Sequence, residues 1–284
     1  MCVDLFMNKV IATDLDGTLL YPKDKKNIVC KPNLYFLQSF IDKGGKVIIV
    51  SGRSLAYGLR VKEKINRNIS IISFNGGALY QDNKIIYSEA IPNKEIIDMS
   101  EDLFKNFKII ALALFSDDGI YIKSVFGKGM TKFVLKVYSF LQKELAEKMI
   151  YSPKLFEETL KSKPIYKVLC IFGFGSRNIN RAKEANKIIR NAYEDIECSW
   201  SNGSLEITAK NVNKGEAIMK YCQINNVPKE DVFVIGDSGN DISMFKAFSE
   251  NSFCMAHSQE SVKKYAKYTV ETIADLSRYI YKNK

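Results

Sequence analysis

Blocks of apolar residues separated by polar segments run along the chain and predict strands and helices in turn. The runs Lys9–Thr13, Lys46–Val50 and Ser70–Phe74 are mainly apolar, and each is followed by polar residues. The spacing of apolar positions in Pro32–Lys43 and in residues 54–64 between them is helical. Continuously apolar strands that alternate with helices are typical of a parallel sheet covered on both faces. The first 81 residues therefore predict part of a doubly wound sheet.

The pattern changes after about Gln81. Asn202-Gly203 separates two short alternating runs, which is a strong hairpin signal. The segment as a whole predicts helices on a mainly antiparallel sheet. The strands are expected at 85–88, 108–116, 119–125, 167–174, 197–201 and 204–208, and the helices at 94–105, 131–147 and 178–192.

The first pattern returns near residue 210. A helix is expected over Lys214–Asn225, a buried strand over Val232–Ile235, a helix from Ile242, and a last strand over Ser252–Met255. The sequence thus predicts an α/β fold with a doubly wound, mainly parallel, Rossmann-like core sheet. Residues 1–81 and 210–284 form this core, and residues 82–209 form an inserted α/β domain.

Charge and composition narrow the classes of partner. The chain has 284 residues and a net charge of +10, but only seven of its 42 basic residues are Arg. Arg is the usual reader of bases and phosphates, so scattered Lys favours a solvated surface, and we expect no nucleic acid. The cysteines form no C-x-x-C pair and there is one His, which argues against zinc. Without a signal peptide or a membrane-length apolar run, we expect a cytoplasmic protein with no membrane contact, either monomer or dimer.

Polar clusters follow the predicted core strands and carry the candidate chemistry. They are Asp14–Thr18, Ser51–Arg53, Asn75–Gly77 and Gly236–Asp241. Because the carboxyl ends of parallel strands share one edge of the sheet, these four segments are expected to converge on one ligand site.

Carboxylates dominate these clusters. Asp14, Asp16 and Asp237 would repel one another by roughly 4 kcal/mol per pair at 4 Å and an effective dielectric of about 20, unless a cation lies among them. An all-oxygen set favours Mg²⁺ bridged to a phosphate. A carboxylate can also attack phosphorus, Ser51 can donate to an anion, and Lys214 can balance its charge.

Each of these residues also has an ordinary interpretation. Asp14–Thr18 could form a simple turn, Ser51 could cap a helix, and Lys214 could be a surface lysine. Whether Lys214 is catalytic or not, we expect its side chain to support no core and its removal to leave the fold intact. Their combination, in this order and at these strand ends, favours a catalytic site.

The motifs together resemble those of the haloacid dehalogenase-like (HAD) superfamily, and specifically its Cof-type phosphatases of subclass IIB. Asp14–Thr18 matches D-x-D-G-T, Ser51–Arg53 matches S/T-G-R, and Asn75–Gly77 resembles the Asn-Gly-Ala segment. Asn213–Ala217 matches the Lys motif at the start of a helix, and Gly236–Asp241 matches G-D-x-x-N-D. The resemblance implies that the inserted domain is a cap that closes over the site.

The resemblance also implies a role for each acidic residue. Asp14 would attack phosphorus, and Asp16 would protonate the leaving alcohol and then deprotonate water. Asp14, the Asp16 backbone carbonyl and Asp237 would hold Mg²⁺, with Asp241 in support.

The phosphoryl group would be held by Ser51, Lys214 and Asn240, with the backbone amides of Leu15 and Gly52. The substrate-side loops would include Asn75, Gly76 and His257. In the last of these loops the chain departs from the family, with Ala256-His257-Ser258 where Gly-Asn-Ala is common.

The sequence therefore predicts an enzyme, a Mg²⁺-dependent phosphomonoester hydrolase that acts on sugar phosphates or similar small metabolites. A phosphomutase of the phosphomannomutase type is one alternative. A basic nucleic-acid-binding protein on a HAD scaffold is another.

Overall fold

The computed structural model describes residues 8–24, 27–127, 129–133, 136, 146–173, 175–201 and 203–280. The chain folds into two compact units. The core unit combines the segments up to Tyr87 and from Asn213 onward, and the inserted unit is Ser88–Val212.

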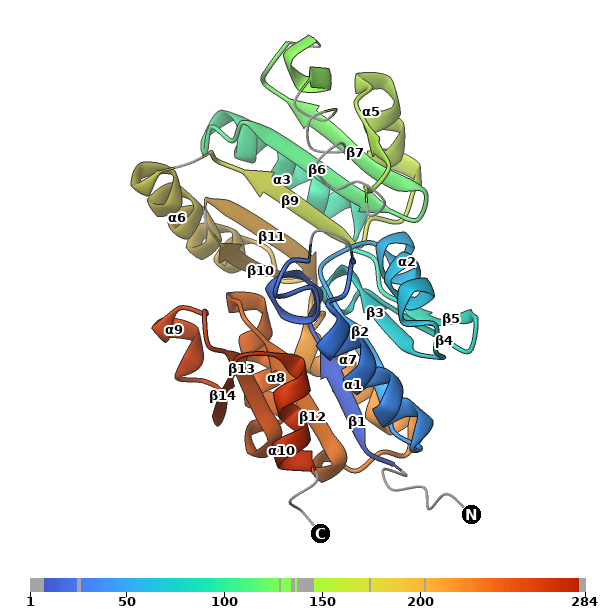
Figure 1. The fold of residues 1–284 in the computed structure, drawn as a ribbon. Coiled ribbons are helices and arrows are strands. Elements are labelled where there is room, and N and C mark those ends of the chain that lie inside the picture. Colours follow the sequence, from blue (N-terminus) through green and yellow to red (C-terminus); the bar gives the residue numbers. More distant parts are fainter. Residues whose placement is uncertain are drawn as a thin grey trace. The chain divides into compact units, whose positions relative to one another are not determined.

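An eight-stranded sheet forms the centre of the core unit (Figure 1). All its adjacent pairs from β14 through β3 are parallel, and β4 runs antiparallel to β3. The parallel strands therefore end at one edge of the sheet, as the sequence pattern predicts. In spatial order the strands are β14 (Tyr268–Val270), β13 (Ser252–Met255), β12 (Val232–Gly236), β1 (Val10–Thr13), β2 (Lys46–Val50), β3 (Ser70–Ser73), β4 (Ala78–Gln81) and β5 (Lys84–Ser88).

Helices cover both faces of this sheet. Successive side chains of each strand point to opposite faces, so a continuously apolar strand has apolar side chains to bury on both. Val10 and Ala12 of β1 pack in a buried cluster with residues of α7 (Lys214–Asn225) and α8 (Ile242–Ala247). On the other face, Gly58 of α2 (Leu55–Ile65) lies close against Ile71 of β3. The remaining core helices are α1 (Lys31–Asp42), which contacts β2, and the short α9 (Glu260–Lys263) and α10 (Ser277–Ile280).

The inserted unit has a six-stranded sheet whose pairs are antiparallel, except that β7 and β8 are parallel. Residues of three helices, α3 (Asn93–Lys105), α5 (Pro153–Ser162) and α6 (Ser176–Ala192), form one buried cluster with the strands. The strand order is β10 (Ile196–Ser201), β11 (Ser204–Ala209), β9 (Lys167–Ile171), β6 (Ala111–Ser116), β7 (Gly119–Ser124) and β8 (Met149–Ile150).

Several expected elements differ from the structure. The units divide after Tyr87 and Val212 rather than after residues 81 and 209, because β5 continues the core sheet beside β4. The strand Ser252–Met255 is not the last one, since β14 follows it at the sheet edge. The helix expected over 131–147 falls largely outside the described residues; residues 131–133 and 136 are helical, and residues 146–148 are not. Asn202 of the expected hairpin also lies outside them, although β10 and β11 pair antiparallel up to Ser201 and Ser204.

Among the residues described, the structure contains no helix with both the length and the apolar character of a membrane span.

Candidate active site

The loop after β1 carries the first two acidic residues. Asp14 has an extended backbone, and its N–H donates to the Ile235 carbonyl at the end of β12 at 3.0 Å. An irregular helical turn, Leu15–Leu19, follows. Gly17 has a φ of +83°, and a Cβ built there would lie 2.5 Å from Asp237 Oδ2. A glycine is therefore required for the Asp14 loop to approach Asp237 this closely.

The loop after β12 is organised by a buried carboxylate, Asp241. Its Oδ2 accepts from the backbone N–H groups of Asp237 at 2.9 Å and Ser238 at 2.8 Å. The Ser238 hydroxyl oxygen lies 3.2 Å from the same oxygen. Thr18 ties the two loops together, because its hydroxyl donates to Asp237 Oδ1 at 2.9 Å.

Lys214, the first residue of α7, lies between the two loops. Its ammonium group is fully buried and contacts Asp14 Oδ1 and Asp241 Oδ1, each at 2.6 Å. The preceding residue, Asn213, caps the helix by accepting from the Glu216 N–H at 3.0 Å. The interpretation of Lys214 as a surface lysine is therefore wrong, and so is the expectation that its side chain supports no core. The fold brings this helix start against the ends of β1 and β12.

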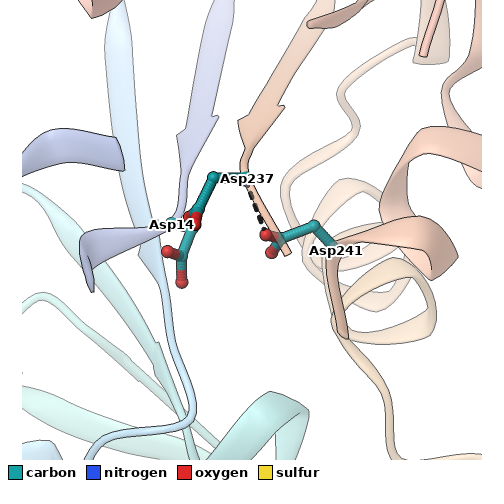
Figure 2. A group of neighbouring side chains, drawn as sticks. All are labelled: Asp14, Asp237 and Asp241. Atoms are coloured by element: carbon teal, nitrogen blue, oxygen red, sulfur yellow. Dashed lines mark hydrogen bonds between the residues drawn. The ribbon is translucent and has the colours of Figure 1, made fainter. Parts of the chain in front are cut away.

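Three carboxyl groups converge at this point, from Asp14, Asp237 and Asp241 (Figure 2). One oxygen of each lies within 4.8 Å of the others. Burial raises the pKa of Asp14 well above its usual value, an effect that Lys214 opposes and that the two other carboxylates reinforce. Burial and Asp241 likewise raise the pKa of Asp237. Three acidic groups therefore share one ammonium group, and the repulsion between their ionised forms favours a bound cation or a proton.

The chemistry of this donor set fits a divalent cation. The converging ligand atoms are all carboxylate oxygens, which Mg²⁺ prefers to nitrogen or sulfur. The Asp16 side chain is not one of the three carboxylates that the structure brings together. Its backbone carbonyl, predicted as a ligand, lies in the Asp14 loop.

A second group of polar residues follows β2 and β3. Ser51 is buried after β2, and its carbonyl accepts from the Asn75 N–H at 2.9 Å. Phe74 and Asn75 both have a positive φ, of 55° and 59°, which is rare for residues other than glycine. Asn75 Oδ1 accepts from Asn240 Nδ2 at 3.3 Å, and Asn240 Oδ1 accepts from the Ser238 hydroxyl at 2.7 Å. The predicted phosphate ligands Ser51 and Asn240 are thus joined through Asn75.

The backbone amides predicted to bind phosphate belong to these same loops. Leu15 follows Asp14 directly and is fully buried, and Gly52 follows Ser51. Gly76 has a φ of +119°, and a Cβ there would lie 2.7 Å from the Asn213 carbonyl. The turn after β3 therefore packs closely against the start of α7.

His257 lies in the loop after β13, which leaves the sheet at the same edge. Its imidazole is exposed, and its ring centre is 4.1 Å from that of Tyr21. His257 also slightly opposes the rise in the pKa of Asp237.

Arg53 is part of the S/T-G-R motif, but the sequence indicates no role for it. Its guanidinium binds the Asp16 carboxylate through two hydrogen bonds, of 2.7 and 3.0 Å. The position of an Arg directly after Ser51 and Gly52, which are predicted to bind an anion, was the only signal in the sequence that could have identified it. The hydrogen bonds of Thr18 and Ser238 could not be predicted from the sequence either, because the fold decides which side chains meet.

The haloacid dehalogenase-like hydrolase family profile matches residues 11–277, and the chain belongs to this family. It is 26% identical over 254 residues to the 5-amino-6-(5-phospho-D-ribitylamino)uracil phosphatase YwtE of Bacillus subtilis, with 84% of each chain covered. The structure of a haloacid dehalogenase-like hydrolase from B. subtilis superimposes with a TM-score of 0.77 at 23% identity, covering 95% of this chain and 99% of that one. The HAD subclass IIB sugar phosphatase BT4131 has a TM-score of 0.75 at 21% identity, covering 95% and 98%. The family and these relatives make the chain an enzyme of the phosphatase class.

Proposed function

We propose that this protein is a Mg²⁺-dependent phosphomonoester hydrolase that works through an aspartyl-phosphate on Asp14. The observation that supports this most directly is the contact of Asp14 with the buried ammonium of Lys214, beside the carboxylates of Asp237 and Asp241. A carboxylate is a sufficient nucleophile for phosphorus when nearby positive charge balances the phosphoryl oxygens.

The first half-reaction transfers the phosphoryl group from the substrate to Asp14, and residues of several loops take part in it. An Asp14 oxygen forms a bond to phosphorus while the bond between phosphorus and the leaving oxygen breaks. Asp16 gives a proton to that leaving oxygen. Lys214, Ser51 and Asn240 hold the phosphoryl oxygens, with the backbone amides of Leu15 and Gly52.

Bound Mg²⁺ would neutralise negative charge on the phosphoryl group. Asp14, the Asp16 carbonyl and Asp237 would hold it, with Asp241 in support. Asp241 accepts two backbone N–H groups and the Lys214 ammonium, so its position is fixed from several directions.

The substrate is proposed to be a small phosphorylated metabolite such as a sugar phosphate. The names of the relatives support this class, since one is a phosphatase of a ribitylamino-uracil phosphate and another a sugar phosphatase. The inserted unit, Ser88–Val212, is proposed to act as the cap that selects the leaving group, together with the loops of Asn75, Gly76 and His257.

Phosphate release from a panel of phosphomonoesters tests this proposal. The panel includes hexose phosphates and the ribityl phosphate named for the B. subtilis relative. We expect release with Mg²⁺, loss of activity in EDTA, and recovery when Mg²⁺ is added in excess. Ca²⁺ should support little activity, because its larger and looser shell would displace the nucleophile.

Two results would contradict the proposal. Full activity in excess chelator would exclude the metal. An isomerised sugar without free phosphate would show a mutase. Asp14→Asn serves as the control, because it preserves the shape of the side chain and removes the nucleophile.

A further inference from the structure

Arg53 and Asp16 form a two-point ion pair within the candidate site. Arg53 Nε donates to Asp16 Oδ2 at 2.7 Å, and Nη2 donates to Oδ1 at 3.0 Å. The two parallel bonds fix the plane of the carboxylate as well as its distance. The Asp16 side chain is 49% exposed, so without this contact the surrounding protein would hold it only loosely.

The backbone and the side chain of Arg53 are both held in place by neighbouring residues. Its backbone N–H donates to the Ser51 hydroxyl at 3.2 Å, and its carbonyl accepts from the Phe74 N–H at 3.0 Å. Its guanidinium lies 4.8 Å from the ring centre of the buried Tyr57, a stacked arrangement that suits arginine. The ion pair therefore joins the loop of the proposed phosphate ligand Ser51 to the loop of the proposed nucleophile.

We propose that Arg53 is a positioning residue that holds the Asp16 carboxylate as the base for the second half-reaction. This rests on the proposed function. In that step a water oxygen bonds to phosphorus, the bond between phosphorus and Asp14 breaks, and the proton of the water passes to Asp16. Asp14 returns to a carboxylate, and inorganic phosphate leaves.

The two-point contact leaves the Asp16 carboxylate able to accept a proton from water. Each carboxylate oxygen has two acceptor sites, so the Arg53 pair uses one on each oxygen and leaves the other available. The first half-reaction on p-nitrophenyl phosphate needs no proton, because nitrophenolate is a good leaving group. Loss of Arg53 should therefore slow hydrolysis of the phospho-enzyme and spare its formation.

A rapid-quench experiment on the full chain with p-nitrophenyl phosphate and Mg²⁺ tests this inference. For Arg53→Ala, the ratio of the burst rate to the steady-state rate should rise by about 10- to 100-fold over wild type. A general acid or base contributes about 10²–10⁴-fold to the rate, and loss of the residue that positions it should cost part of that factor. Acid-stable, hydroxylamine-labile phosphate should accumulate on the protein. Arg53→Lys should recover part of the steady-state rate, and millimolar guanidinium should speed the steady state of Arg53→Ala without changing its burst.

Arg67→Ala is the matched control. Arg67 makes the same two-point contact with Asp42, at 2.6 and 2.9 Å, away from the site, so its removal should leave both rates unchanged. If Arg53→Ala fails to give a native circular dichroism spectrum, Arg53→Gln takes its place.

The outcomes separate the inference from the proposed function. Wild-type kinetics in Arg53→Ala would overturn the inference, and so would an equal slowing of the burst and the steady state, which would assign Arg53 to substrate binding or phosphoryl transfer. A wild-type protein that releases no phosphate from any ester would refute the proposed function itself, and the inference with it.

Discussion

Lys214 should be essential both to the stability of the core unit and to catalysis. In Lys214→Met, the side chain keeps its length and loses its charge, so Asp14 and Asp241 lose the cation that contacts both at 2.6 Å. Removing one partner of a buried ion pair costs about 3–5 kcal/mol, out of a total stability of about 5–15 kcal/mol. The loss of a preorganised charge on the phosphoryl group should also lower kcat by about 10²–10³-fold.

The pH dependence of this loss has a definite sign. Burial already raises the pKa of Asp14 above its value in the unfolded chain, and Lys214 is the group that opposes this rise. Without Lys214 the folded protein binds the Asp14 proton more tightly, so the native state is favoured at low pH. The native state then loses stability as the pH rises through the raised pKa of Asp14. The free energy of unfolding of the variant should therefore be nearer to that of wild type at pH 5 than at pH 8.

Urea unfolding in EDTA measures the effect, followed by two signals. The single Trp of the chain, Trp200, lies in the inserted unit, whereas far-UV circular dichroism reports both units. We expect Lys214→Met to lower the circular dichroism midpoint and to leave the Trp200 transition in place. Mg²⁺ should restore part of the loss, since a ligand at 100 times its Kd stabilises the native state by about 2.7 kcal/mol.

Lys154→Ala is the control, because Lys154 is 85% exposed and contacts Glu158 at 3.8 Å on the surface. It should leave both transitions unchanged. A Lys214→Met protein with the wild-type circular dichroism midpoint in EDTA at pH 8 would refute the reasoning.

Three further predictions follow from the site. Asp14→Asn should abolish even a single turnover of p-nitrophenyl phosphate, whereas Asp16→Asn should give a nitrophenol burst and then stall, as rapid quench would show; an equal burst from Asp14→Asn would exclude it as nucleophile. Gly76→Ala should lower the free energy of unfolding in urea by about 1–3 kcal/mol, because its φ of +119° and the Asn213 carbonyl leave no place for a Cβ. The control Gly129→Ala should leave that free energy unchanged, because the space around Gly129 is open. Asn75→Ala should weaken inhibition by inorganic phosphate by about 5- to 10-fold, the equivalent of one hydrogen bond, through the freed amide of Asn240; unchanged inhibition would contradict this.

The core sheet was predictable because both of its faces are buried. Strands such as Lys46–Val50 then read as continuous apolar runs, and polar residues mark the edge where they end. β14 was missed since it has three residues at a sheet edge, where one face need not be apolar. α5 was missed although Ser152 caps it and Pro153 begins it, because its ten residues contain few apolar positions.

The convergence of these acidic and basic residues at one edge of the sheet was predictable, and their individual contacts were not. Motif order and strand ends indicate that Asp14, Lys214 and Asp237 share one edge of the sheet. The burial of Lys214 could not be predicted, since a lysine at a helix start is exposed unless another element packs on it. The partner of Arg53 depends on side-chain rotamers at the ends of two different strands, which no local pattern specifies.

The place of β1 in the sheet has a consequence for how the protein is made. β1 pairs with β2 on one side and with β12 on the other, and Asp14 meets Lys214 across 200 residues of sequence. A nascent chain on the ribosome therefore has one edge of β1 unpaired until residues of β12 have emerged. The strand pairs of the inserted unit all lie within Ser88–Val212, so this unit can fold while the core waits. Fragments that stop before α7 lack Lys214, Asp237 and Asp241 together, so translation must pass the insert before these residues can meet Asp14.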